Sequence, residues 1–160
     1  MDRTSAPAPR TGSQGRPWWL LILPAVFLAH IGEEVFAGEG FAVWTGRIFG
    51  SPLGAARYAA INLVGWPAFL ILTVVAIVSP RLRWLAATLA TMLLVNAGLH
   101  GLGTLYTWSY SPGLVTALLL YPAPCIAALR MIRKTQPTAF GPAVTVGIAL
   151  HAVVMVAAFA

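Results

Sequence analysis

The sequence has 160 residues, of which 59% are hydrophobic and only 9% are charged, and its mean hydropathy is +0.81. Soluble domains have about half apolar and about a quarter charged residues, so this composition excludes a soluble protein and predicts a protein of the lipid bilayer. The net charge of +6 comes from basic residues that stand singly or in pairs at the ends of apolar runs. That distribution is typical of membrane topology signals and argues against nucleic acid as a partner.

The chain is predicted to be all-α, a polytopic membrane helix bundle with about five transmembrane helices of about 20 residues each. Residues 1–16 are rich in proline, serine, glycine and arginine and predict a disordered cytoplasmic tail, and 17–160 a single transmembrane domain. The expected spans, in chain order, are 17–36, 59–78, 84–105, 112–131 and 140–160. The stretch 37–58 is too polar to span, and a short interfacial or re-entrant helix is expected over 41–49.

Basic residues are distributed unevenly between the two sides of these spans. One side has only Arg47 and Arg57, whereas the N-terminal side has Arg3, Arg10, Arg16, Arg81, Arg83, Arg130, Arg133 and Lys134. The positive-inside rule therefore predicts a cytoplasmic N-terminus and an external C-terminus. We expect a multi-pass protein of the cell membrane, with the plasma membrane of a bacterium as its location.

The candidate functional residues begin in the first span, in the sequence "AHIGEEVFAG" at 29–38. It contains His30, Glu33 and Glu34, which are one of the three histidines and two of the four acidic residues of the whole chain. Side chains three and four residues apart lie on one face of a helix, so both carboxylates can lie beside His30. Ionisable residues inside a membrane are costly, which makes them functional candidates.

The three histidines are expected at a similar depth. With a rise of ~1.5 Å per residue, His30 lies ~20 Å, His100 ~24 Å and His151 ~17 Å along spans that run in the same direction. Asn96 precedes His100 by one helical turn, and Asn62 lies near the outer end of the second span. These positions predict one polar site in the outer half of the bilayer.

The charges of this site predict a metal ion. Two adjacent carboxylates in a low-dielectric environment repel each other, and no arginine or lysine lies in the outer half of any expected span. A divalent cation would compensate them, and a set of histidines and glutamates suits Zn²⁺ or Fe²⁺. We predict that His30, Glu34, His100 and His151 bind the metal, and that Glu33 or Glu34 acts as a general base; the sequence leaves open which glutamate has which role.

These motifs resemble a known family. "HIGEE" at His30–Glu34 matches the HXXEE pattern of a family of integral membrane proteins that is also recognised by a second histidine and a YXPG motif. His100 and "YSPG" at Tyr110–Gly113 supply both in the expected order. The resemblance implies a membrane protein and leaves its activity open, because the family has no known function and enzymatic activity has only been suggested. His151 lies outside the motifs.

The YSPG segment also has a local interpretation. Ser111 suits a helix N-cap and Pro112 the first helical position, so "SPG" is expected to begin the fourth span. Tyr110 would then lie at the mouth of the site, where its hydroxyl could donate a proton, and it is the third catalytic candidate beside Glu33 and Glu34.

Two functions and one structural alternative fit these residues. The first function is an intramembrane metalloenzyme that hydrolyses or oxidises an apolar or lipid substrate from the outer leaflet. The second is a small proton-coupled transporter or ion-binding protein that uses the same cluster. The structural alternative is a hydrogen-bonded cluster with protonated carboxylates that joins the helices. The sequence does not predict the oligomeric state.

Overall fold

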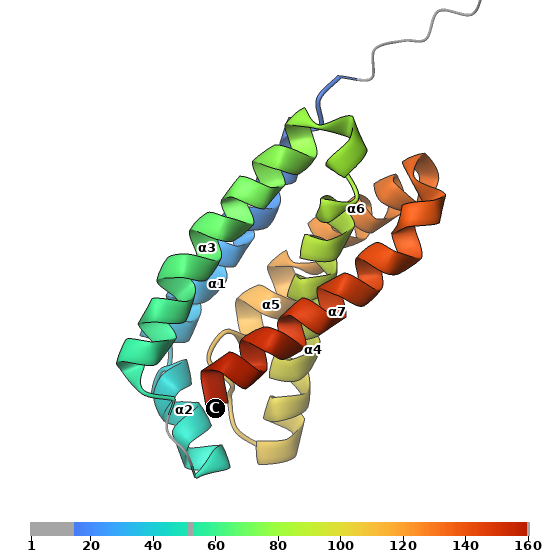
Figure 1. The fold of residues 1–160 in the computed structure, drawn as a ribbon. Coiled ribbons are helices and arrows are strands. Elements are labelled where there is room, and N and C mark those ends of the chain that lie inside the picture. The colour runs from blue at the N-terminus through green and yellow to red at the C-terminus, as the bar shows by residue number, and fades with distance from the viewer. Residues whose placement is uncertain (1–14, 51–52, 160) are drawn as a thin grey trace, which may run out of the picture.

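The computed structural model describes residues 15–50 and 53–159, so most of the predicted tail lies outside the described residues. The described chain is helical and contains no strand (Figure 1). A 3₁₀ turn, Trp18–Leu21, leads into α1 (Ile22–Phe36), followed by α2 (Phe41–Phe49), α3 (Ala55–Val78), a 3₁₀ turn at Pro80–Leu82, α4 (Leu85–Thr107), α5 (Leu114–Leu120), α6 (Pro122–Thr135) and α7 (Pro137–Phe159). The all-α prediction is confirmed.

Four helical stretches are long and apolar enough to cross a membrane: Trp18–Phe36, Ala55–Val78, Pro80–Thr107 and Pro137–Phe159. Helices α5 and α6 pass the same test as a pair, with a bend of 45° between them. The chain is therefore a multi-pass helical protein with four to five spans, in agreement with the predicted bundle.

The fourth span differs from its prediction because it is broken. Helix α5 ends at Leu120, and α6 begins at Pro122. Proline has no N–H to donate, and its ring collides with the preceding turn, which bends a helix. Pro122 and Pro124 stand close together at this bend, whereas α3 and α7 each continue through one proline, Pro67 and Pro142. The expected continuous helix over 112–131 is thus two shorter helices.

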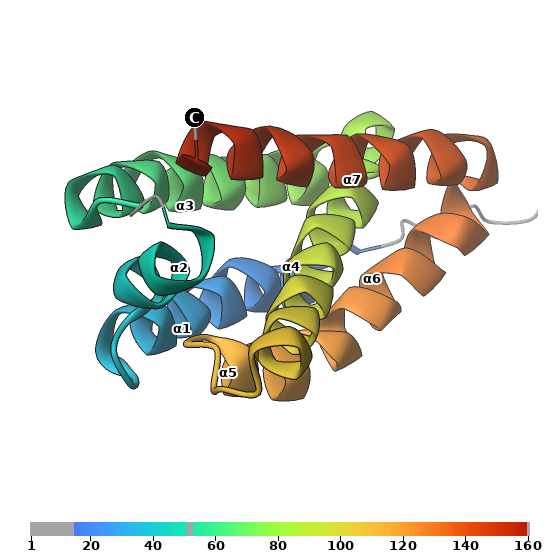
Figure 2. The same ribbon diagram turned by 90° about the horizontal axis from the view of Figure 1, so that it is seen from below.

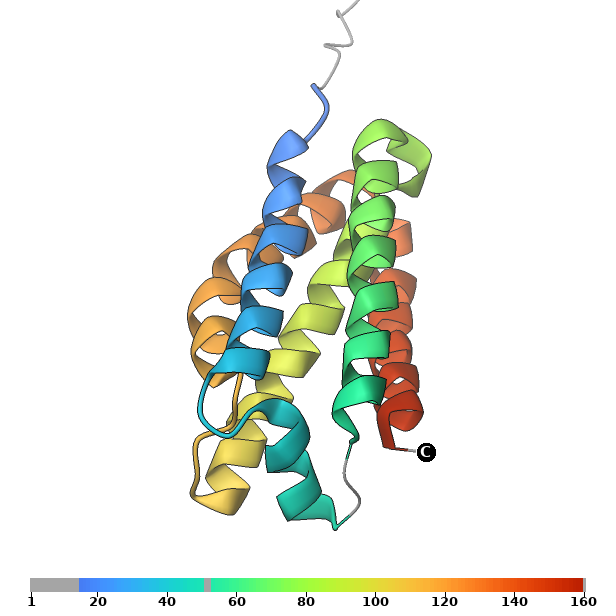
Figure 3. The same cartoon turned by 90° about the vertical axis from the view of Figure 1, so that its left-hand side faces the viewer.

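The helices alternate in direction along the bundle. Figures 1 and 3 show the beginning of α1, the turn between α3 and α4, and the turn between α6 and α7 at one end, and α2 with the C-terminus at the other. The two turns are joined, because Gln136 Nε2 donates a hydrogen bond of 2.8 Å to the carbonyl oxygen of Pro80. This arrangement places the basic residues of both turns on the side where the chain enters α1.

Helix α4 is the centre of the bundle. It contacts α1, α3, α5, α6 and α7, and Figure 2 shows it between the layer of α3 and α7 and the layer of α1 and α5. Small residues such as Ala86, Ala87 and Ala90 let its neighbours approach closely. Helix α7 packs closely on it, since a Cβ at Gly147 would lie 2.6 Å from the carbonyl oxygen of Thr88.

Helix α2 lies at the end of the bundle opposite these turns and has the bounds of the short helix predicted over 41–49. It ends at Gly50, whose φ of 67° is the left-handed conformation that commonly closes a helix. Trp44 anchors α2 to α4, since a Cβ at Gly103 would lie 2.7 Å from the Trp44 ring. Helix α2 thereby extends the bundle beyond the C-terminal end of α1 and the N-terminal end of α3.

Candidate metal centre

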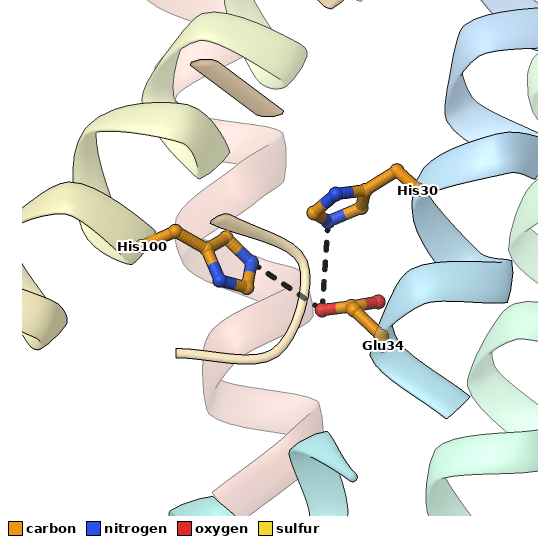
Figure 4. A group of neighbouring side chains, drawn as sticks. All are labelled: His30, Glu34 and His100. Atoms are coloured by element: carbon orange, nitrogen blue, oxygen red, sulfur yellow. Dashed lines mark ion pairs between the residues drawn. The ribbon is translucent and has the colours of Figure 1, made fainter. Parts of the chain in front are cut away.

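Three of the predicted site residues meet in the interior of the bundle. His30 and Glu34 lie one turn apart on α1, and His100 reaches them from α4 (Figure 4). The Nε2 atoms of His30 and His100 lie 3.5 Å and 3.4 Å from the same carboxylate oxygen, Oε1 of Glu34. All three side chains are buried, and one potential ligand atom from each lies within 4.8 Å of the others.

The opposite ring nitrogens of both histidines are held by hydroxyl groups. His30 Nδ1 lies 3.0 Å from Thr116 Oγ1, and His100 Nδ1 lies 2.8 Å from Ser111 Oγ. The Thr116 hydroxyl donates to the carbonyl of Gly113 at 3.2 Å, so its oxygen is left to accept the Nδ1–H of His30. This tautomer leaves the Nε2 lone pair of His30 directed at the cluster.

The second oxygen of the Glu34 carboxylate is held by Tyr58. The Tyr58 hydroxyl donates a hydrogen bond of 2.7 Å to Oε2 of Glu34 from the first turns of α3. Sequence reasoning missed Tyr58, Ser111 and Thr116 as parts of the site. The available signal was weak: Tyr58 lies one turn before Asn62, which was the polar residue noticed in this span.

The YSPG segment forms part of the centre instead of only beginning a helix. Gly113 has φ 99°, and a Cβ there would lie 2.6 Å from His30 Cε1, 2.9 Å from Glu34 Cγ and 2.9 Å from His100 Cε1. Helix α5 begins at Leu114, and its N-cap residue is Gly113, which has no side chain to cap the helix. The prediction that Ser111 is the N-cap is therefore wrong, because its hydroxyl bonds to His100.

Glu33 faces a different partner from Glu34. Its carboxylate accepts hydrogen bonds from the backbone N–H groups of Val115 at 2.9 Å and Thr116 at 2.6 Å, in the first turn of α5. The hydroxyl of Tyr110 also donates to Glu33. Glu33 thus supplies to α5, from α1, the carboxylate that N-capping normally takes from the helix's own sequence.

His151 is buried but does not belong to the group of His30, Glu34 and His100. It lines a cavity together with Asn96, one turn before His100 on α4. Arg47 is also separate from the group: its Nη2 lies 2.6 Å from Oε1 of Glu39. This exposed pair lies in and beside α2, so Arg47 does not compensate the charge of Glu34.

The fold and these contacts define a multi-pass helical membrane protein with a buried histidine and glutamate cluster. The family model described as "Protein of unknown function with HXXEE motif" matches residues 21–128, and the chain belongs to this family. The matched range contains His30, Glu34 and His100 and excludes His151. Comparison with curated proteins and with solved structures gives no match.

Proposed function

We propose that His30, Glu34 and His100 bind a divalent metal ion in a membrane enzyme. The observation that carries this proposal is the position of both Nε2 atoms at 3.4–3.5 Å from one oxygen of Glu34. These separations exceed the usual 2.7–3.2 Å of an N–H···O hydrogen bond. Bonds of 2.0–2.2 Å to a tetrahedral ion would instead separate neighbouring ligand atoms by about 3.3 Å.

The ligand set suits a catalytic ion better than a structural one. Catalytic zinc sites have three protein ligands and an open position, and two histidines with one carboxylate also form the triad of non-haem iron oxygenases. A bound Zn²⁺ would activate water for hydrolysis, whereas Fe²⁺ would support oxidation. The identity of the metal would therefore decide between the two reactions that the sequence left open.

An apolar groove gives the cluster access to the membrane and supports an apolar or lipid-like substrate. The groove has a volume of about 660 Å³ and lies between α1 and α3, beside α2. Leu28, Ile31 and Leu63 are among its lining residues, and it reaches Glu34 and Tyr58. Its size is that of a small-molecule site, and because its walls are two candidate spans, lipid chains could enter it sideways.

The proposed location is the outer half of the cell membrane, as expected for the plasma membrane of a bacterium. This placement is supported by the basic residues at the opposite end of the bundle. A transport function would need polar residues in the inner half of the spans as well, and these support it less well. The buried polar residues there are Thr73, Thr88 and Thr91, and each donates to a backbone carbonyl. In the described chain, no buried histidine or carboxylate continues the site toward that end.

Metal content of the purified full-length protein in detergent tests the proposal. We expect about one equivalent of zinc or iron in the wild type and a loss of most of it in His30→Ala and His100→Ala. Glu39→Gln is the matched control, because Glu39 pairs with Arg47 outside the cluster. Equal metal content in the wild type and in both histidine variants would overturn the proposal.

A further inference from the structure

A second cavity lies on the α7 side of the cluster, between α3, α4 and α7, with a volume of about 140 Å³. Its polar lining residues are Glu34, Tyr58, Asn62, Asn96 and His151, and the remaining ones are apolar or glycine. Glu34 and Tyr58 also line the larger groove between α1 and α3. The two cavities therefore adjoin at the carboxylate of Glu34.

The packing of α4 against α7 brings His151 to the level of Asn96. The two helices run in the same direction (Figure 1), and Gly147 lies against Thr88 and Thr91. His151 lies one helical turn after Gly147 on α7, and Asn96 lies just over one turn after Thr91 on α4. Both side chains line the same cavity, so the register is maintained beyond the glycine contact.

His151 and Asn96 present polar atoms that have no partner. His151 is 6% exposed, and its Nε2 and the Oδ1 of Asn96 are buried without a hydrogen bond in the described structure. Buried polar atoms are almost always hydrogen-bonded, and an unpaired one is costly, especially in a membrane. Two such atoms in one cavity point to a polar group that binds there.

The charges around the cavity indicate which kind of polar group can bind there. No lysine or arginine lines the cavity, and the carboxylate of Glu34 disfavours a phosphate or carboxylate ligand. An uncharged hydroxyl satisfies both open atoms, because it can donate to Asn96 Oδ1 and accept from the Nε2–H of His151. An apolar chain on the same molecule would fit the groove between α1 and α3.

We infer that Asn96 and His151 form a polar subsite for the free hydroxyl group of a lipid alcohol, a molecule with one long apolar chain. The inference names the substrate class of the proposed metal centre and rests on that proposal for the reaction. It does not rest on it for binding, since neither Asn96 nor His151 belongs to the group that could hold the metal.

Photolabelling of the full-length protein in detergent micelles tests the subsite. The probe is a long-chain alkanol with a diazirine in its chain, compared with its methyl ether, which cannot donate a hydrogen bond. We expect the alkanol to reach half-maximal labelling at a concentration roughly tenfold lower than the ether, as for the loss of one hydrogen bond. Equal values for the two probes in the wild type would mean that the cavity holds water only and would overturn the inference.

Two substitutions test whether Asn96 and His151 bind the probes. Asn96→Leu removes the acceptor of the hydroxyl proton, so it should raise the alkanol concentration to that of the ether and leave the ether unchanged. His151→Phe should raise the concentrations of both probes, because an ether oxygen can also accept from the Nε2–H of His151. Thr145→Val is the control on α7, because Thr145 is exposed and bonds only to the carbonyl of Gly141. Preservation of the alkanol preference in Asn96→Leu, or labelling of His151→Phe at the concentrations of the wild type, would contradict the assignment. Asn96→Ala replaces the leucine variant if that one does not fold.

Metal content of the same samples separates the two proposals. Asn96→Leu and His151→Phe should retain the metal of the wild type, and His30→Ala should retain the preference for the alkanol. Loss of metal in His151→Phe would make His151 a ligand and overturn the subsite. A metal-free wild type that still prefers the alkanol would instead leave the subsite standing and remove the metal centre.

Discussion

Gly113 lies so close to His30 that any other residue would collide with the imidazole: a Cβ at position 113 would be 2.6 Å from His30 Cε1. The ring cannot easily turn away, because it is buried and its Nδ1 is held by Thr116. The φ of 99° at Gly113 is a second obstacle, since L-residues rarely adopt it. The glycine of the YSPG segment is therefore required by the histidine of the HIGEE segment.

The first prediction is that Gly113→Ala disrupts the cluster. The backbone strain alone should cost roughly 1–3 kcal/mol, and the collision should displace His30 or Glu34 and remove the bound metal. Gly50→Ala is the matched control, because its φ is also positive at 67° but nothing lies within 4 Å of the added Cβ. The unfolding temperature and the metal content should both fall in Gly113→Ala. In Gly50→Ala only the unfolding temperature should fall. Normal metal content in Gly113→Ala would contradict the close approach.

The second prediction concerns the hydroxyl groups behind the histidines. Ser111→Ala and Thr116→Val remove the partners of the two Nδ1 atoms, and loss of such an outer contact typically weakens metal affinity about 10–100-fold. We expect this decrease in a competition titration with a chelator, with helix content unchanged. Thr73→Val, whose hydroxyl bonds to Phe69 far from the cluster, should have the affinity of the wild type. Unchanged affinity in both site variants would mean that the histidines do not depend on these hydroxyls.

The third prediction is an alkaline transition at Tyr110. Burial and the hydrogen bond to Glu33 raise the pKa of Tyr110 to about 12, from an ordinary value of 10.0. Because the folded protein favours the neutral phenol, the stability from this contact is complete below pH 10.0 and is lost as the pH rises toward about 12. Tyr110→Phe should remove a phenolate signal with an apparent pKa near 12 from the ultraviolet titration. A transition at the ordinary pKa of tyrosine would show that Tyr110 is free of Glu33.

The sequence predicted the depth of the site residues along their helices better than the direction in which each side chain points. Apolar runs set the spans, and the rise per residue placed His30 and His100 at one depth, where they do meet. The same reasoning placed His151 at this depth, where it lines a cavity with Glu34 but lies outside the group of His30, Glu34 and His100. Adjacent residues differ by about 100° around a helix, so Glu33 and Glu34 point in different directions from α1. Glu33 contacts the first turn of α5, and this contact depends on where α5 begins. That position follows from tertiary packing.

The fourth prediction is the orientation of the bundle. The turn with Arg81 and the last turn of α6, with Arg133 and Lys134, lie at the end where α1 begins. The excess of basic residues at this end predicts that it faces the cytoplasm. Reporter fusions after Phe159 should therefore report an external C-terminus, and fusions between α6 and α7 a cytoplasmic position. A cytoplasmic reporter after Phe159 would invert the bundle and place the His30 cluster in the inner half of the membrane.

The last prediction separates the two adjacent glutamates. Glu34→Gln replaces a carboxylate that lies 3.5 Å and 3.4 Å from the two imidazoles, so it should lose most of the metal. Glu33→Gln should retain it, because Glu33 instead accepts the N–H groups of Val115 and Thr116. Loss of that capping carboxylate should lower stability by roughly 0.5–2 kcal/mol. Metal content and thermal unfolding of the two variants in detergent measure both effects. The reverse pattern, with metal lost in Glu33→Gln and kept in Glu34→Gln, would exchange the two roles and leave His30 and His100 without their shared carboxylate.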